Sequence, residues 1–274
     1  MSIRVTLSAN AGVAIEIGGI RIWVDALHDV QVPGFSTLRA QRLRQLWTAE
    51  AFQSPDVIVY THCHPDHYSQ QLTTEAHLRW PKARLILPQK EFAEQELVSG
   101  DEYTAVVEGT VLHFYRLPHE SQHYTADVSH YGLTITHGTE AILLPGDCAV
   151  VSPALLPLIA RQHFRLVLLN FPWITLRKGR EFIEQHILAD HIIVDHLPFA
   201  EDDTEHFRAA AVSEAERLRS GCGAAAHIFW TISCKRPRFR EARGAAPRQP
   251  ATLDMYEIRI PLRLGGGISP LKGK

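Results

Sequence analysis

Residues 62–67 read His-Cys-His-Pro-Asp-His, and this short segment constrains the chain more than any other. It follows the apolar, β-branched run 56–60, which predicts a short buried strand that ends where the histidines begin. A sequence so dense in imidazole and carboxylate favours a metal site over a loop of surface histidines, because both groups are common ligands of divalent metals.

The spacing within the segment predicts two metals. Alternate residues of an extended chain lie on one side, so His62 and His64 can converge on one point. Pro65 interrupts the extended course and leaves Asp66 and His67 free to face a second point. Two pairs aimed at two targets indicate a dinuclear centre.

The same residues carry a resemblance to a known family. His62-x-His64-x-Asp66-His67 is similar to the His-x-His-x-Asp-His signature of the metallo-β-lactamase-fold hydrolases. The resemblance spans about residues 3–232 and implies an α/β fold, a four-layer αβ/βα sandwich of the metallo-β-lactamase type. It departs at residues 8–12, Ser-Ala-Asn-Ala-Gly, where the family usually has a Gly-His pair that could supply a supporting histidine.

A third ligand of the first metal is expected just past the strand predicted over 111–117. His119 follows the strand stop at Pro118, where the sheet holds the backbone and the loop lets the imidazole turn. His123, four residues further on, is the rival ligand. Whichever of the two is not a ligand is expected to face the substrate or to support the site.

The resemblance also assigns the remaining ligands. Asp147, after the strand predicted over 140–144, matches the bridging carboxylate, and a carboxylate has the two oxygens that joining two metals requires. His196, after a later strand, completes the set. The commonest zinc β-lactamases have cysteine where Asp147 stands, so a zinc β-lactamase of that kind is not expected. We expect Cys148 only to pack. The implied ligand set is His62, His64 and His119 on one metal, Asp66, His67 and His196 on the other, and Asp147 between them.

Alternating and helical patterns elsewhere predict the remaining elements. A strand and a β-hairpin over residues 2–25 open the chain, and a second hairpin is expected over 131–144. The expected helices are 37–53, 72–78, 89–97, 153–163, 176–188 and 205–219, and the other expected strands are 83–87, 165–169, 191–195 and 226–232, with 255–264 as a possible edge strand.

Net charge and the pattern of apolar segments limit which partners and which cellular location are expected. A net charge of −2 and a pI of about 6.8 give no overall attraction to nucleic acid or to an anionic membrane. We find no signal peptide or membrane span and expect a cytoplasmic protein. Residues 1–234 are predicted to form the hydrolase domain. Residues 235–274, which begin with six basic side chains against one acidic in 235–250, are expected to be a basic, Pro/Gly-containing tail with little order.

These features predict a metal-dependent hydrolase in which a hydroxide bound by two metals cleaves an ester, lactone, amide or phosphodiester of a small molecule, with Asp66 and Asp147 as catalytic groups. Zinc is favoured, while manganese or iron would tolerate the carboxylates. The nearest branch by resemblance contains the ascorbate-6-phosphate lactonase. Phe171 and Trp173 could wall the substrate pocket or simply pack in the core. The alternatives are a nuclease or cyclic-nucleotide phosphodiesterase and, in another class, an iron-dependent oxidoreductase.

Overall fold

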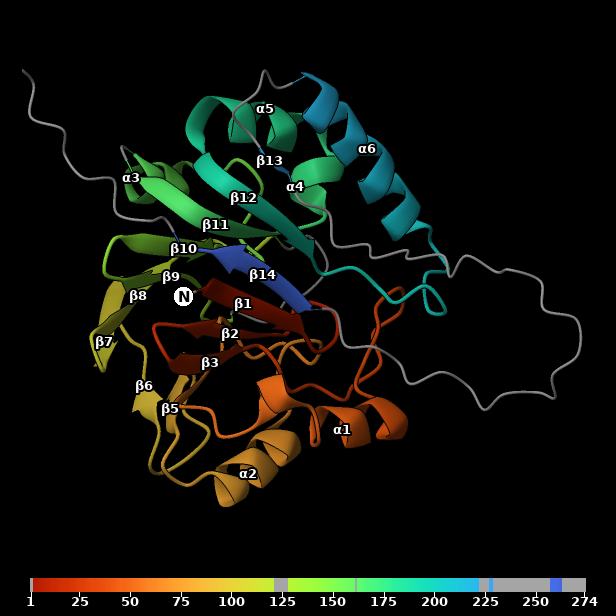
Figure 1. Cartoon of the computed structure of the whole chain (residues 1–274). Helices are drawn as coiled ribbons and strands as arrows, with labels where there is room; N and C mark the ends of the chain where they lie inside the picture. The colour runs from red at the N-terminus through yellow and green to blue at the C-terminus, as the bar shows by residue number, and fades with distance from the viewer. Residues whose placement is uncertain (1, 121–127, 161, 222–226, 229–256, 263–274) are drawn as a thin grey trace, which may run out of the picture.

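The computed structural model describes residues 2–120, 128–160, 162–221, 227–228 and 257–262. Within these residues, two seven-stranded sheets pack face to face, and helices cover the outer face of each sheet (Figure 1). This arrangement confirms the four-layer αβ/βα sandwich that the sequence predicted.

The first sheet has the strand order β14-β1-β2-β3-β4-β5-β6. Its opening strands are antiparallel, and Gly18 and Gly19, with φ of 62° and 87°, form the tight turn between β2 and β3. From β3 to β6 the strands run parallel. The strands are β1 (Ser2–Leu7), β2 (Val13–Ile17), β3 (Ile20–Val24), β4 (Val57–Val59), β5 (Arg84–Leu87), β6 (Glu96–Leu97) and β14 (Glu257–Pro261).

The second sheet has the order β13-β12-β11-β10-β9-β8-β7. Strands β10 to β13 run parallel, and β8 and β10 are both antiparallel to β9, so β8, β10, β11 and β12 all end at the same edge of the sheet. The strands are β7 (Glu102–Val107), β8 (Thr110–Arg116), β9 (Tyr131–His137), β10 (Glu140–Leu144), β11 (His163–Asn170), β12 (Leu188–Asp195) and β13 (His227–Ile228).

Three apolar clusters hold the layers together. The central cluster joins the facing sides of the two sheets and includes Ile15, Phe114 and Ile142, each fully buried. Trp23 lies in the cluster under α1 (Ala40–Leu46) and α2 (Gln70–Arg79), and Trp173 lies in the cluster under the helices of the second sheet. Burying side chains of this size stabilises the fold by about 1.5–3 kcal/mol each. The second sheet's helical elements are η2 (Pro153–Leu155), α3 (Leu156–Ile159), α4 (Pro172–Thr175), α5 (Arg177–His186) and α6 (Phe207–Gly221).

Three predicted helices were wrong in extent or type. The helix expected over 37–53 is only α1 followed by the short η1 (Glu50–Phe52). Residues 89–95 form a loop instead of a helix, in which the Gln95 side chain accepts hydrogen bonds from the backbone of Glu91 and Phe92 and donates one to Gln89. Glu96 and Leu97 form β6 beside β5. The helix expected over 153–163 ends at Ile159, since His163 already begins β11 beside β12.

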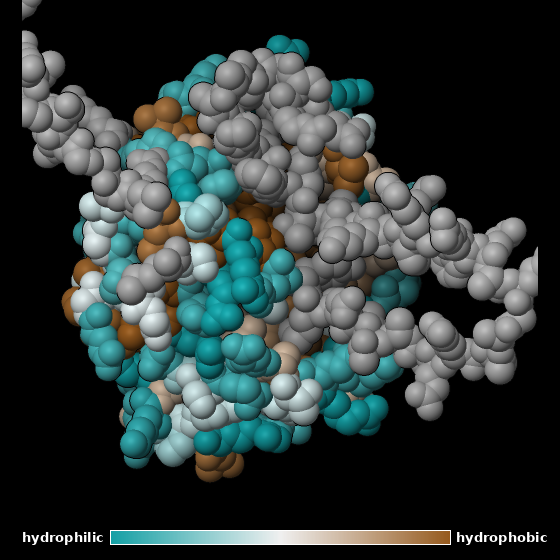
Figure 2. All heavy atoms as spheres, viewed as in Figure 1, coloured by the Kyte–Doolittle hydropathy of each residue, from teal (hydrophilic) through white to brown (hydrophobic). Residues whose placement is uncertain are grey.

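The C-terminal segment contributes to the fold. Strand β14 pairs antiparallel with β1 at the edge of the first sheet, as the alternation over 255–264 predicted. The rest of the predicted tail and the domain boundary at 234 lie outside the described residues. On the face shown in Figure 2, hydrophilic side chains predominate over the lower helical layer, as solvent-facing helices require. No helix in the described ranges combines the length and apolarity needed to cross a bilayer.

Candidate metal centre

The predicted ligands meet where the two sheets present their strand ends. Residues 62–67 follow β4, Asp147 follows β10 and His196 follows β12. His119 lies just beyond β8, where it forms an isolated bridge with Cys148. Backbone hydrogen bonds from Glu120 to Asp147 (2.7 Å) and from Ala149 to Pro118 (2.8 Å) fasten this loop to the one that carries Asp147.

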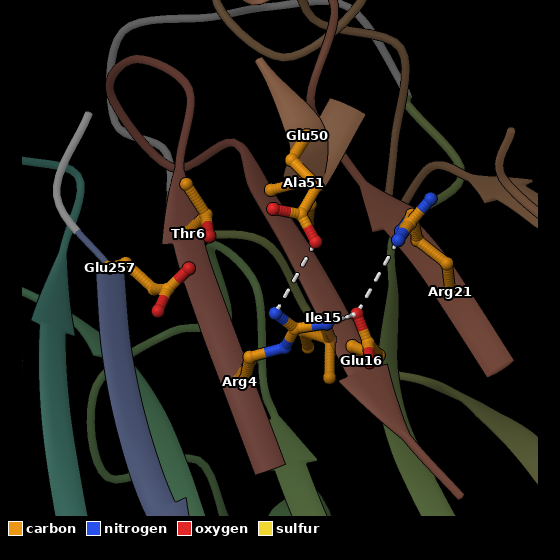
Figure 3. A pocket seen from close by; sticks show the side chains of 9 residues that line it. Arg4, Thr6, Ile15, Glu16, Arg21, Glu50, Ala51 and Glu257 are labelled. Carbon is orange, nitrogen blue, oxygen red and sulfur yellow. Dashed lines mark hydrogen bonds and ion pairs between the residues drawn. The ribbon is translucent and has the colours of Figure 1, made fainter. Parts of the chain in front are cut away.

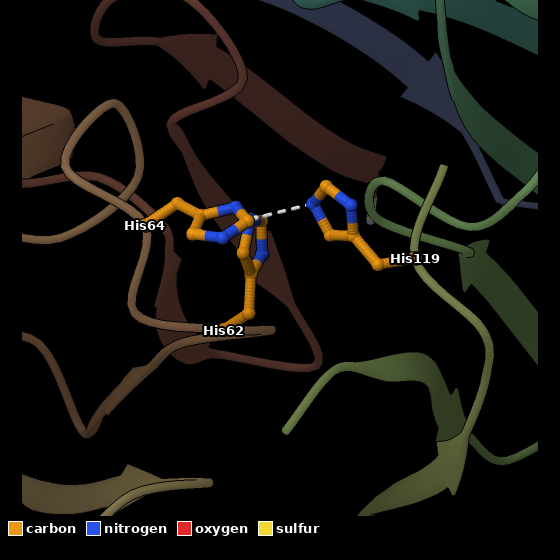
Figure 4. A group of neighbouring side chains, drawn as sticks. All are labelled: His62, His64 and His119. Atoms are coloured by element: carbon orange, nitrogen blue, oxygen red, sulfur yellow. Dashed lines mark hydrogen bonds between the residues drawn. The ribbon is translucent and has the colours of Figure 1, made fainter. Parts of the chain in front are cut away.

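His62, His64 and His119 form the first group of ligand atoms. The Nε2 atoms of His62 and His119 lie 3.3 Å apart, and the ligand atoms of all three residues lie within 4.8 Å of one another. Figure 4 shows the three imidazoles turned toward a common point from the β4 loop and from the segment after β8. The structure therefore brings His119 to the position predicted for the third ligand. His123, its rival, lies outside the described residues.

Asp66, His67 and His196 form the second group. The Nε2 atoms of His67 and His196 lie 3.1 Å apart, and Asp66 Oδ2 lies 3.5 Å from His196 Nε2 and 4.0 Å from His67 Nε2. All three ligand atoms fall within 4.8 Å of one another, which is compact enough for one ion.

Asp147 lies between the groups. Its Oδ2 is 3.3 Å from the Nε2 atoms of both His67 and His196 and 3.8 Å from Nε2 of His119. Asn170, at the end of β11, donates from Nδ2 to the other oxygen of Asp147 at 3.3 Å. One carboxylate oxygen therefore faces ligands of both groups, so a bridge at this position would use Oδ2 alone, whereas the sequence prediction assigned it both oxygens.

The donor spacing fits a metal. Two nitrogens bound at about 2.0–2.1 Å to one tetrahedral ion lie about 3.3–3.4 Å apart. The observed Nε2 separations of 3.3 Å and 3.1 Å are close to this value. The chemistry of the donors agrees, because five imidazoles and two carboxylates suit zinc, manganese or iron.

Asp25, at the end of β3, orients ligands of both groups. It is buried, and its carboxylate accepts hydrogen bonds from Thr61 N (2.7 Å) and Thr61 Oγ1 (2.6 Å) and contacts His67 Nδ1 at 3.1 Å. Because the Thr61 hydroxyl donates to Asp25, it can accept from His62 Nδ1, which lies 3.0 Å away. Both imidazoles thus hold a proton on Nδ1 and keep Nε2 for a ligand.

Electrostatics differ between the two groups. Burial lowers the pKa of His62, His64 and His119, so these rings are neutral and ready to donate a lone pair. Burial also opposes charge on His67 and His196, but Asp147 is the leading attraction at both rings. It holds the pKa of His67 well above its ordinary value and, with help from Asp66, raises that of His196 to about 10. The carboxylates of Asp66 and Asp147 therefore favour positive charge at the second group.

The loop at residues 8–12 supports the second group, although it has no Gly-His pair. The carbonyl of Asn10 accepts from His196 N at 3.1 Å, and Asn10 Nδ2 donates to the carbonyl of Asp66 at 3.3 Å. Asn10, Asp25 and His196 all have left-handed backbones, with φ of 53°, 49° and 55°. Such conformations cost about 1–3 kcal/mol each and persist only where the surroundings enforce them, which is typical of functional sites.

Two further histidines are buried beside the ligands. His130 Nδ1 lies 3.0 Å from the carbonyl of Leu117, and its ring packs on His62 and His119 at 5.2 Å and 5.4 Å. Gly146, with φ of 59°, is required here because a Cβ would lie 2.8 Å from His130 Nε2. His28 is fully buried, with Nε2 3.2 Å from the carbonyl of Ala9. Burial lowers the pKa of both rings to about 4, so both are neutral supports.

The two residues proposed for the pocket wall, Phe171 and Trp173, have different surroundings. Trp173 is fully buried in the core and packs on Phe182 at 5.4 Å between ring centroids. Its role is therefore core packing, and its side chain is not at the surface where a substrate could contact it. Phe171 is half-buried and stacks on Phe207 at 4.8 Å. Cys148 is buried in the same core as Trp173, as expected of a packing residue.

Sequence reasoning missed four supporting residues. Asp25 is the last residue of the region predicted over 2–25, and no contact with a ligand was predicted for it or for Asn10, Thr61 and Asn170. The available signal was position: Asp25 and Asn170 each stand at the carboxyl end of an apolar strand, and Asn10 stands where the family motif changes.

A pocket on the outer face of the first sheet is lined by charged side chains that pair with one another (Figure 3). Arg4 pairs with Glu16 and with Glu50 (3.7 Å), and Arg21 pairs with Glu16 at 3.5 Å. These ion pairs link β1, β2, β3 and η1 and have a structural role.

Comparisons with known proteins agree with this fold. No family model and no curated protein matches the chain. Among solved structures, the metallo-β-lactamase-fold protein YhfI from Bacillus subtilis is 12% identical with a TM-score of 0.52, and the match covers 84% of this chain and 95% of that one. The isothiocyanate hydrolase from Delia radicum gut bacteria is 17% identical with a TM-score of 0.54, covering 83% and 95%.

A third match is CmlA, a diiron β-hydroxylase from Streptomyces venezuelae, with 14% identity and a TM-score of 0.53. It covers 79% of this chain but only 50% of CmlA, so this chain spans half the length of that protein. The chain has the metallo-β-lactamase fold, with groups of His and Asp side chains at its strand ends that could bind metal. The ascorbate-6-phosphate lactonase branch stays a prediction.

Proposed function

We propose that this chain is a metal-dependent hydrolase that cleaves an ester, lactone, amide or phosphodiester of a small molecule. The observation that carries the proposal is the position of Asp147, whose Oδ2 lies within 3.3 Å to 3.8 Å of imidazole nitrogens from both ligand groups. His62, His64 and His119 would hold one ion, Asp66, His67 and His196 the other, and Asp147 both. Two divalent ions held there would supply a water of lowered pKa and polarise the oxygen of the scissile bond.

The protein's own groups support this chemistry. The side chains of Asp66, Asp147 and His119 keep exposures of 12%, 15% and 15%, so the cluster can be reached from solvent. Attraction to His67 and His196 outweighs burial and holds the pKa of both carboxyls below its usual range, so both are ionised near neutral pH. Asp66 and Asp147 would therefore act as anionic ligands that favour divalent cations at the cluster.

The first test is metal content together with turnover. Protein reconstituted with zinc is expected to hold two ions per chain and to hydrolyse at least one member of a panel of esters, lactones, amides and phosphodiesters. Manganese and iron should be tested in parallel, because the carboxylates tolerate them. A stoichiometry of one or less would contradict the dinuclear assignment, and two bound metals with no turnover across the panel would contradict the hydrolase.

An iron-dependent oxidoreductase is the second candidate, because the structural match to CmlA shows that a diiron β-hydroxylase has this fold. Protein purified without added metal separates the two candidates: iron at two per chain with oxygen consumption would favour the oxidoreductase. A nuclease or cyclic-nucleotide phosphodiesterase ranks lower, because a net charge of −2 offers a polyanion no overall attraction. A small-molecule substrate and a cytoplasmic location complete the proposal.

A further inference from the structure

Three phenylalanine rings lie beside the second ligand group. Phe35 comes from the loop after β3, Phe171 immediately precedes α4, and Phe207 begins α6. The ring of Phe35 lies edge-on against the imidazole of His196, with 4.5 Å between centroids and an interplanar angle of 88°. Phe207 stacks on Phe171 at 4.8 Å and on Phe35 at 6.1 Å. We call these three rings the aromatic wall.

The aromatic wall is not part of the core. All three rings are half-buried, and within the described residues none of them belongs to the three apolar clusters that hold the layers together. Phe199, in the same region, is buried in the cluster of the first sheet. Aromatic side chains left partly exposed together, next to a polar site, are typical of a surface that binds something apolar.

Polar contacts hold the wall in place. Ser36 Oγ donates to Asp202 Oδ2 at 2.8 Å and accepts from Phe199 N at 2.6 Å, and Arg39 pairs with Asp202 at 2.8 Å. These contacts join the loop that carries Phe35 to the segment that leads from His196 to Phe207. Gly34, with φ of 82°, lets Phe207 approach, since a Cβ there would lie 3.2 Å from its ring. A surface fixed in this way loses little conformational entropy when a ligand binds.

We propose that the aromatic wall binds the apolar acyl or aryl arm of the substrate, while the polar scissile group lies at the metal centre. This inference rests on the proposed function and narrows its substrate class to small molecules with an apolar arm next to a hydrolysable bond. The contact between Phe35 and His196 makes the apolar surface continuous with the ligands. Phe35 and Phe171, whose centroids are 6.5 Å apart at an interplanar angle of 47°, lie against each other and extend this apolar surface away from His196.

Binding of hydroxamic acids tests the proposal without requiring turnover. Calorimetry on zinc-reconstituted protein would compare acetohydroxamate, butanohydroxamate, hexanohydroxamate and benzohydroxamate, which share a metal-chelating head. Each added methylene is expected to tighten binding about threefold to fourfold in the wild type, as for a buried CH₂. A parallel series of alkanoates on chelator-treated protein, followed by ligand-detected NMR, should show the same order.

Variants of the wall should remove this dependence on the arm. Phe35→Ala and Phe207→Ala should weaken hexanohydroxamate about tenfold to a hundredfold, because each loses much of a buried aromatic contact. Acetohydroxamate should change less than twofold in Phe207→Ala, because the Phe207 ring packs on Phe35 and Phe171 and not on His196. Phe207→Leu keeps apolar surface and should retain the alkyl series but lose the benzohydroxamate preference. Tyr103→Ala, which removes a half-buried ring from distant β7, is the control, and thermal unfolding checks that each variant is folded.

Equal affinity for the whole series in the wild type, or an unchanged chain-length dependence in folded Phe35→Ala and Phe207→Ala, would overturn the proposal. Measuring the turnover of matched acetyl and hexanoyl esters distinguishes a failure of the aromatic-wall proposal from a failure of the proposed hydrolase function. If binding depends on the wall but no ester, lactone, amide or phosphodiester is cleaved, the wall is supported and the hydrolase is refuted.

Discussion

Replacing Asp25 by Asn tests whether this residue positions the metal ligands. The wild-type carboxylate accepts from Thr61 N and Thr61 Oγ1 and contacts His67 Nδ1, at 2.6 Å to 3.1 Å. An amide has nearly the same shape but only one acceptor oxygen. If that oxygen keeps the Thr61 backbone, the NH₂ group faces the Thr61 hydroxyl and the His67 imidazole, which are both donors.

The magnitude follows from these contacts. A hydrogen bond to a charged group contributes about 1.5–3 kcal/mol, so losing two should lower the free energy of unfolding by about 3–6 kcal/mol. Loss of the partner that orients a ligating imidazole typically weakens metal binding about 10-fold to 100-fold. Because His67 belongs to the second group and His62 depends on Asp25 through Thr61, both ions should be affected.

Competition with a chromophoric chelator measures the metal affinity, and urea denaturation measures the stability. Asp56→Asn is the matched control, since Asp56 Oδ2 accepts from Arg21 N at 2.8 Å at the opposite end of β4, away from the ligands. It should cost stability and leave metal affinity unchanged. A folded Asp25→Asn protein with wild-type metal affinity, within twofold, would refute the positioning role even if its stability fell.

Three further predictions follow from the same geometry. Asp147→Ala should lower metal content below two per chain and abolish turnover with little unfolding, because the Asp147 side chain contacts the imidazoles of His67 and His196 and no core packing is lost; wild-type turnover would contradict the bridge. His119→Ala should lower metal content, whereas His123→Ala should keep both metals and change substrate affinity; metal loss only in the His123 variant would reverse the assignment. His28 is fully buried, and burial lowers its pKa from 6.5 to about 4. As the pH falls below 6.5, the unfolded chain therefore binds a proton at His28 before the folded chain does. The free energy of unfolding should be highest above pH 6.5 and should fall by about 3 kcal/mol toward pH 4. His28→Asn should remove this part of the pH dependence in urea titrations of chelator-treated protein. His186→Asn on α5 serves as the control. An unchanged pH profile in His28→Asn would show that the loss of stability at low pH has another origin.

Much of the site could be predicted because its ligands are encoded locally. Residues 62–67 are contiguous and follow an apolar strand, so the alternation of an extended chain and the break at Pro65 suffice to predict which residues pair. Asp147 and His196 were assigned by family resemblance, and each also follows an apolar run. The orientation of these ligands could not be predicted, since Asp25, Asn10 and Asn170 act across loops and sheets that only the folded chain brings together.

The errors in secondary structure have a similar origin. Residues 89–97 have a helical pattern, but the Gln95 side chain holds the backbone of Gln89, Glu91 and Phe92 in a loop, and Glu96 and Leu97 pair with β5. The helix expected over 153–163 does not extend to His163, because His163 begins β11 and pairs with Leu188 of β12. In both cases a contact outside the local pattern decides the conformation.

The loop at residues 8–12 shows how a departure from the family motif can still serve the site. It closes on itself through Ser8 N to Gly12 O and Gly12 N to Ala9 O, each 2.8 Å, and a Cβ on Gly12 would lie 2.7 Å from the carbonyl of Asp25. From this closed loop, Asn10 bonds the backbones of Asp66 and His196, which belong to loops of different sheets. A supporting imidazole could orient one ligand, whereas this asparagine fixes the separation of two. The spacing of the second ligand group is therefore set by backbone contacts near the N-terminus as well as by the strands that deliver the ligands.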